Sequence, residues 1–180
     1  ILPFIIFGVM MGTAGSFPIQ IIAFFFMDVL KLDTDNAIQL AGVGLMASSM
    51  AALFAQLVVV QRFKLSAGQL MRIGIGTGFA SYILFIVGNT YGIIVFALLL
   101  SGLGFGLIRP GYAAAASLAV GREQQGAAAG ITGGAGASGF IFAPLIGNKL
   151  YEWDPHAPFW LGAALMIAMA VYVLLTPRLR

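Results

Sequence analysis

The sequence predicts an all-α integral membrane protein with six transmembrane helices. Hydrophobic residues make up 61% of the 180 residues and charged residues only 8%. Soluble domains are usually about 45–50% apolar and about 25% charged, and a chain of this length has too little interior to bury so much apolar surface. The apolar residues also fall into runs of about 20 or more, which is the length of a membrane-spanning helix. Lipid is therefore the solvent that this chain requires.

Six runs are long enough to span a bilayer. Lipid offers no partner for an unpaired peptide group, so these runs must be helical, and the alternation of about ten residues typical of membrane barrels is not visible. The predicted spans are 2–28, 37–60, 70–88, 92–118, 126–151 and 157–176.

Polar and charged residues mark each break between the spans. In chain order the breaks hold Lys31 with Asp33 and Asp35, Arg62 with Lys64, Asn89 with Thr90, Arg122 with Glu123, and Glu152 with Asp154, Pro155 and His156.

The basic residues predict the orientation, because successive loops lie on opposite sides of the membrane. One side carries Arg62, Lys64, Arg72, Arg122, Arg178 and Arg180, and the other carries Lys31 and Lys149. The positive-inside rule places the first set in the cytoplasm. We therefore expect a multi-pass protein of the cell (inner) membrane with both termini of this segment cytoplasmic.

Composition also excludes several partners. The chain has no cysteine, which rules out disulfides and thiolate metal sites. Its basic residues stand singly between apolar runs, whereas nucleic-acid binding requires a clustered basic face. The sequence begins Ile-Leu-Pro-Phe, with neither Met nor a basic leader, so we expect further residues upstream.

The fifth span contains a repeat of small residues. Gly126, Gly130, Gly134 and Ser138 recur every four residues and form one smooth helix face. Such faces let two membrane helices approach closely, which predicts helix packing here. Gly134-x-Gly136-x-x-Gly139 also matches the dinucleotide fingerprint, but that motif works only between a strand and a helix, so no cofactor is expected.

Gly136-Ala-Ser138-Gly139 resembles the Gly-x-Ser-Gly of rhomboid proteases, which also have six spans. A serine nucleophile needs a base within hydrogen-bond reach, and the only histidine is His156 in a loop. Ser138 lies about 20 Å from the helix end before that loop. The sequence therefore predicts no catalytic residue and no enzyme.

Arg109 is the most informative residue, because it lies inside the fourth span. Helical spacing places small and aromatic residues on its face: Gly102, Phe105, Gly106, Tyr112, Ala113 and Ala116. A charge within a span usually faces a cavity or a partner. Arg109 is about 16 Å from the inner helix end, so we expect it to face a cavity with Phe105 and Tyr112. Snorkelling to the interface and bonding to backbone carbonyls are the alternatives.

The first span carries a weaker polar stripe. Thr13, Ser16, Phe17, Gln20 and Phe24 share one side of the helix. Gln20 and Phe17 are candidate cavity residues, although polar side chains can equally bond to a neighbouring helix. No Asp or Glu lies deep within a span, so a proton carrier, which is commonly an intramembrane carboxylate, is expected outside this sequence.

Three motifs resemble the C-terminal half of a major facilitator superfamily transporter of the drug:proton antiporter branch. They are Gly102-x-Gly104-x-Gly106 followed by Pro110-Gly111, Gln125-Gly126-Ala-Ala-Ala-Gly130, and Ala143-Pro144-Leu-Ile-Gly147-Asn148-Lys-Leu-Tyr151. The resemblance implies two inverted three-helix repeats that face an N-terminal six-helix half across a central site. It implies that the first and fourth spans line the cavity, and that Pro144 and Gly147 serve helix packing or gating with the glycines before them.

The resemblance implies a secondary transporter that exports hydrophobic drugs or other small molecules in exchange for protons. Arg109 favours an alternative in the same fold, the transport of a sugar or organic anion, because it could hold a carboxylate or phosphate. A six-span channel and an intramembrane protease are alternatives from other classes. No filter sequence or charged ring supports a channel, and one loop histidine argues against a protease.

Overall fold

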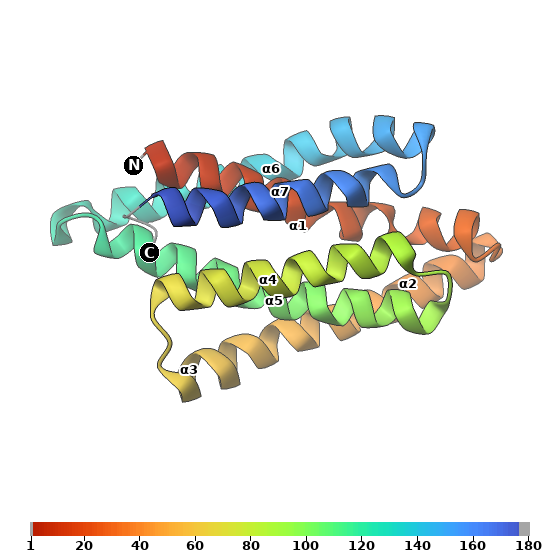
Figure 1. Cartoon of the computed structure of the whole chain (residues 1–180), viewed down its shortest axis with the longest axis horizontal. Coiled ribbons are helices and arrows are strands. Elements are labelled where there is room, and N and C mark those ends of the chain that lie inside the picture. Colours follow the sequence, from red (N-terminus) through yellow and green to blue (C-terminus); the bar gives the residue numbers. More distant parts are fainter. Residues whose placement is uncertain (1, 177–180) are drawn as a thin grey trace.

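The computed structural model describes residues 2–176, and in that range the chain is entirely helical, with no strand (Figure 1). Six helices are long and apolar enough to cross a membrane, as the sequence predicts. The elements are α1 (Leu2–Val29), α2 (Thr34–Phe54), a π-helical segment η1 (Ala55–Val59), α3 (Val60–Phe63), α4 (Ala67–Val87), α5 (Tyr91–Leu118), a short 3-10 turn η2 (Arg122–Gln124), α6 (Gln125–Trp153) and α7 (Ala157–Leu175).

Local capping explains why two spans begin earlier than their apolar runs. Asp33 caps α2, because its carboxylate accepts a hydrogen bond from the Asn36 backbone N–H at 3.1 Å. Those contacts with Asn36 also lower the pKa of Asp33. Ser66 and Gln69 form a reciprocal capping box at the start of α4. Lys64, in the left-handed conformation, ends α3. α2, η1 and α3 form one continuous span over Thr34–Phe63.

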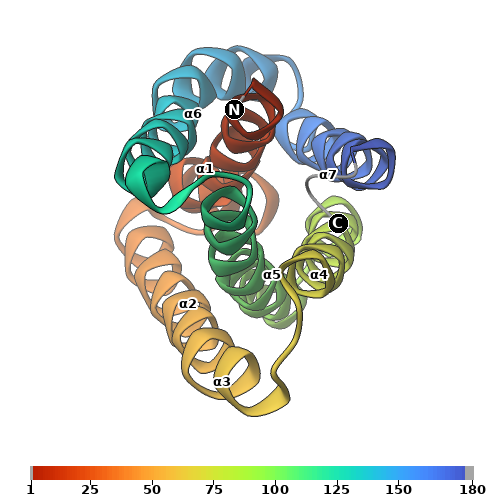
Figure 2. The same ribbon diagram turned by 90° about the vertical axis from the view of Figure 1, so that its left-hand side faces the viewer.

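The helices pair across the two halves of the chain. α1 packs against α6 and α7, whereas α5 packs against α2 and α4. The first helix of each three-helix set thus lies against the second and third helices of the other set, as expected for interlocked inverted repeats. Figure 2, which looks along the bundle, shows α1 and α5 at the centre, with α2 and α6 on one side of them and α4 and α7 on the other.

Glycines bring the backbones of α4, α5 and α2 close together. A Cβ added at Gly104 would lie 2.8 Å from the Gly78 nitrogen, and one at Gly102 would lie 2.0 Å from the Ser48 carbonyl oxygen. Real Cβ atoms do not approach a neighbouring backbone so closely, so α5 can hold both neighbours only with glycine at these positions. The repeated Gly-x-Gly of α5 therefore serves packing on two sides.

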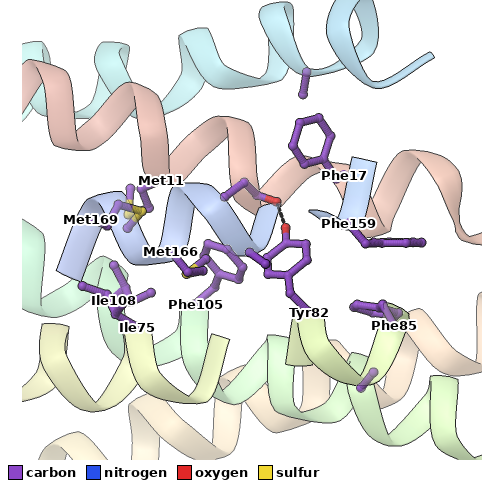
Figure 3. Close-up of a cluster of buried hydrophobic side chains, with 14 of the residues drawn as sticks. Met11, Phe17, Ile75, Tyr82, Phe85, Phe105, Ile108, Phe159, Met166 and Met169 are labelled. Atoms are coloured by element: carbon purple, nitrogen blue, oxygen red, sulfur yellow. Dashed lines mark hydrogen bonds between the residues drawn. The ribbon is translucent and has the colours of Figure 1, made fainter. Parts of the chain in front are cut away.

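A buried tyrosine compensates for a proline in α1. Pro18 lacks the N–H that would bond to the carbonyl of Ala14, four residues earlier. The hydroxyl of Tyr82, on α4, donates to that carbonyl, as the dashed line in Figure 3 shows. Tyr82 is fully buried, so its hydroxyl supplies the hydrogen-bond donor that neither water nor lipid could supply to the Ala14 carbonyl.

No helix of this bundle packs on Gly126, Gly130 or Gly134, so their predicted packing role has no partner among the described residues. Nothing lies within 4 Å of a Cβ added at any of the three. The face of α6 that packs on α1 is the adjacent one, which contains Ala128, Thr132, Ala135, Gly139, Ala143 and Gly147. A Cβ at Gly139 would lie 2.2 Å from the Thr13 nitrogen, and one at Gly147 would lie 3.2 Å from the Phe17 ring.

Candidate functional site

Two cavities meet at Arg109. One, of about 220 Å³, lies among α1, α2 and α5, and the other, of about 480 Å³, lies among α1, α5 and α6. Arg109 is the single residue that lines both. We call them the α2-side cavity and the α6-side cavity. We call the two together the hollow; residues of α1 and α5 line both parts of it, residues of α2 line one part and residues of α6 line the other.

The α2-side cavity is lined in part by polar side chains. Four polar side chains line it besides Arg109: Ser48, Ser49, Gln56 and Ser101. The hydroxyl of Ser49 donates to the Leu45 carbonyl at 2.9 Å, so only its oxygen can accept from a ligand. Gln56 is exposed in this chain. The rest of the lining comes from small or apolar residues of α1, α2 and α5, including Gly15 and Phe105.

The α6-side cavity is larger and mainly apolar. Its walls come from Met11 and Gly12 of α1, from Tyr112, Ala113 and Ser117 of α5, and from a row along α6 that includes Ala129, Thr132, Gly133, Gly136, Ala137 and Phe140. The Thr132 hydroxyl donates to the Ala128 carbonyl at 2.8 Å and is therefore engaged within its own helix. Most of this surface would make apolar contacts with a ligand and few hydrogen bonds.

Arg109 has no counter-charge in the part of the chain that the structure describes. Its side chain is exposed, and no ion pair joins it to an acid among residues 2–176. No Asp or Glu lines either cavity. A cation placed in the middle of a membrane helix costs about 3 kcal/mol on insertion scales. A partner, a ligand or water in the cavity would offset that cost.

The other predicted cavity residues divide into two groups. Phe105 lines the α2-side cavity and Tyr112 lines the α6-side cavity, so helical spacing from Arg109 placed both on the right face. The Tyr112 hydroxyl, however, donates to the Phe4 carbonyl at 2.7 Å. Tyr112 is 3% exposed and its ring stacks on Phe7. It therefore presents the edge of its ring to the cavity rather than its polar group.

The prediction that Phe17 faces the cavity is wrong. Its side chain is fully buried between α1 and α6, against Gly147, and Figure 3 shows it directed toward α6. Gln20 lines neither of the cavities that meet at Arg109. The stripe through Thr13 and Ser16 faces the interior, where Ser16 donates to the Gly12 carbonyl at 2.7 Å. A hydroxyl that bonds to a carbonyl of its own helix can be buried against a neighbouring helix, so this stripe serves helix packing.

The acidic residues lie at the helix ends. Tyr151 donates to Asp28 across 2.7 Å, which joins the ends of α6 and α1. Asp154 lies 3.4 Å from His156 in the next turn. Within residues 2–176 no three His, Cys, Asp or Glu side chains gather as metal ligands would.

The sequence profile of the Major Facilitator Superfamily matches residues 2–180, almost the whole chain. The chain belongs to this superfamily. Together with its six apolar helices, this makes it a multi-pass membrane protein of a transporter family. A search of curated protein sequences found no significant match.

Solved structures of peptide transporters share the fold. A mutant of the peptide transporter POT in complex with sulfate superimposes with a TM-score of 0.76 at 18% identity, over 97% of this chain and 36% of that one. A POT family transporter in complex with 5-aminolevulinic acid gives 0.74 at 17% identity, over 98% of this chain and 37% of that one. At such identities the likeness establishes the fold alone. The chain spans little more than a third of the length of these transporters.

Within this superfamily fold, sequence reasoning missed the contribution of α2. Ser48 and Gln56 are two helical turns apart, and Ser49 and Ala52 lie on the same side. A polar stripe on an otherwise apolar span is a detectable signal. The stripe on α2 is a weaker signal than Arg109 because it contains no charged residue. On α6, Gln125 and Thr132 line the α6-side cavity. The glycines of this segment indicate a packing face, so these two polar residues are not among those predicted from the sequence.

Proposed function

We propose that this chain forms one half of a secondary active transporter, and that small molecules cross the membrane through the hollow at Arg109. The superfamily match supports transport. The observation that carries the site is an exposed arginine within the membrane-spanning helix α5 that borders two cavities of about 220 and 480 Å³. Known small-molecule pockets measure roughly 300–1,000 Å³, so the space suits a compact organic solute.

The other half of the transporter is proposed to cover the exposed face of α2 and α6. Apolar side chains remain exposed along α2, including Met46, Met50 and Leu53, and along α6, including Phe140 and Ile141. Part of this surface faces lipid. The stretch bordering the hollow, with Gly126, Gly130 and Gly134, lacks Cβ neighbours in this chain and would allow close approach by a helix from the second half.

Export of hydrophobic drugs or other small molecules in exchange for protons is our leading proposal for the direction and coupling. The likeness of residues 102–151 to drug:proton antiporters supports it. Because no carboxylate lines the cavities in the described residues, the proton carrier is proposed to lie in the other half. The second candidate, transport of a sugar or organic anion, is favoured by the unpaired charge of Arg109.

A reconstituted system tests transport directly. The full transporter that contains this chain, in proteoliposomes with an imposed pH gradient, should move at least one dye or drug from a mixed panel against its concentration gradient. An uncoupler should stop this movement. Arg109→Lys should change the relative rates across the panel, because lysine cannot reproduce the planar fork of arginine. Arg62→Lys, in α3 at the end of the bundle and outside both cavities, is the matched control and should leave the rates unchanged.

Flux that follows the concentration gradient and persists with the uncoupler would indicate a channel and contradict the proposal. Identical profiles for wild type and Arg109→Lys would remove Arg109 from the transport path.

The proposed orientation places both ends of this segment in the cytoplasm. Figure 1 shows that the α3–α4 and α5–α6 turns lie at the same end of the bundle as the start of α1 and the end of α7. That end of the bundle holds Arg62 in α3, Lys64 in the α3–α4 turn and Arg122 in η2, which favours the cytoplasmic side for it. In intact cells, Asp154→Cys should react with an impermeant thiol reagent and Ser66→Cys should not. The opposite labelling pattern would overturn this topology.

A further inference from the structure

The two cavities at Arg109 differ in chemistry and in size. The smaller α2-side cavity, of about 220 Å³, is bordered by the polar side chains Ser48, Gln56 and Ser101. The larger α6-side cavity, of about 480 Å³, is bordered mainly by apolar groups such as Met11 and Phe140. A solute that fills both therefore meets a larger share of polar groups on the α2 side and a larger share of apolar groups on the α6 side.

The charge of that solute follows from Arg109. A guanidinium remains protonated at any physiological pH, and among residues 2–176 it has neither an ion pair nor a carboxylate beside it in either cavity. In a site of low dielectric constant a lone cation attracts an anion and repels a second cation. Its planar fork can also donate two parallel hydrogen bonds to one carboxylate or phosphonate group.

A neighbouring donor fits the same group. Tyr112 is unavailable because its hydroxyl bonds to the Phe4 carbonyl, and the Ser49 proton bonds to the Leu45 carbonyl. The amide of Gln56 and the hydroxyl of Ser101 lie on the polar side of Arg109 without an assigned partner among the described residues. The Gln56 amide can donate to the oxygen atoms of an anion that Arg109 holds, and Ser101, about 12 Å further along α5, can donate to another polar group of the same solute.

We propose that the substrates of this transporter are amphipathic anions. The acidic group lies at Arg109 on the α2 side, and the apolar body lies in the α6-side cavity. This inference rests on the proposed function of the same hollow, and it names the class of substrate. The competing explanation is that an acidic residue from the other half of the transporter pairs with Arg109 and leaves the substrate uncharged.

Three probes of the same shape separate these explanations: 4-phenylbutyrate, its methyl ester and 4-phenylbutylamine. Binding of each is measured by calorimetry on the purified full transporter in detergent, as wild type and as Arg109→Gln. We expect wild type to bind the carboxylate roughly tenfold or more tightly than the ester, which is the usual size of a charge-assisted hydrogen bond. The amine should bind most weakly. Arg109→Gln should lose this preference and still bind the ester.

Equal affinities of wild type for carboxylate and ester would overturn the inference, as would tightest binding of the amine or no binding of any probe. If Arg109 pairs with an acid of the other half, Arg109→Gln should lower the melting temperature of the ligand-free protein and leave the three affinities in the same order. That result would also overturn it. Gradient-driven transport of the dye and drug panel by wild type is a separate readout, so the proposed function stands if only this inference fails.

Discussion

Helices α5 and α6 are both rich in glycine, but they use it differently. On α5, Gly102 and Gly106 lie against the backbone of α2, and Gly104 lies against that of α4. On α6, Gly139 lies against the backbone of α1, whereas nothing in this chain lies near Gly130 or the glycines one turn before and after it. A regular row of small residues thus marks a surface that a helix can approach. It does not identify the helix that approaches it.

The largest difference in stability should be between alanine variants at Gly139 and at Gly130. Gly139→Ala would place a methyl group 2.2 Å from the Thr13 nitrogen, so α1 and α6 would have to move apart, at a cost of about 3 kcal/mol or more. Gly130→Ala meets no atom of this chain within 4 Å and gains helix propensity, so any loss would come only from the proposed contact with the other half and should be smaller. The yield of monodisperse transporter in detergent and its melting temperature measure both.

Comparable losses for Gly139→Ala and Gly130→Ala would mean that the face of α6 that packs has been misassigned. A loss for Gly130→Ala alone would reverse the assignment.

A smaller effect should separate two tyrosines that bond to α1, one from α4 and one from α5. Tyr82→Phe leaves the Ala14 carbonyl without a donor, because Pro18 cannot supply one. The buried, unpaired carbonyl should cost about 1–3 kcal/mol. Tyr112→Phe removes a bond to the Phe4 carbonyl, which also faces the N–H of Gly8 in the helix, so it should cost less. Denaturant titration of the two variants in the same detergent gives the difference.

A larger loss for Tyr112→Phe than for Tyr82→Phe would contradict the compensation of Pro18 by Tyr82. It would show that contact between α5 and α1 depends more on Tyr112 than its hydrogen bond indicates.

The sequence alone predicted the positions of the helices and singled out Arg109 as a candidate site residue. It did not predict which face of each helix packs against its neighbours. Apolar length predicts the spans because each helix satisfies its own backbone in lipid. Arg109 stood out because a charge within a span has few uses, and helical spacing then placed Phe105 and Tyr112 on its side. Phe17 was misplaced because rotation of α1 about its own axis is set by contacts with α6 and α4, which lie far away in sequence.

The polar stripe of α2 shows a second limit. Ser48 and Gln56 become site residues only because α5 brings Arg109 opposite them. That approach depends on Gly102 and Gly106, whose contacts with Ser48 and Ala52 are defined by the folded bundle. Pairing between helices on different repeats is a long-range property, and a single sequence carries little information about it.

Two alanines of α5 test most directly whether the α6-side cavity is open along that helix. Ala113 is exposed and lines the α6-side cavity, whereas Ala116, almost one helical turn further on, is 3% exposed. Each is replaced by cysteine in a full transporter whose other cysteines have been removed, and the rate of reaction with a small water-soluble thiol reagent is measured in detergent. If the cavity is open to water at Ala113, we expect fast labelling of Ala113→Cys, slowed by a transported compound, and slow labelling of Ala116→Cys. Slow labelling at position 113 together with fast labelling at 116 would contradict it.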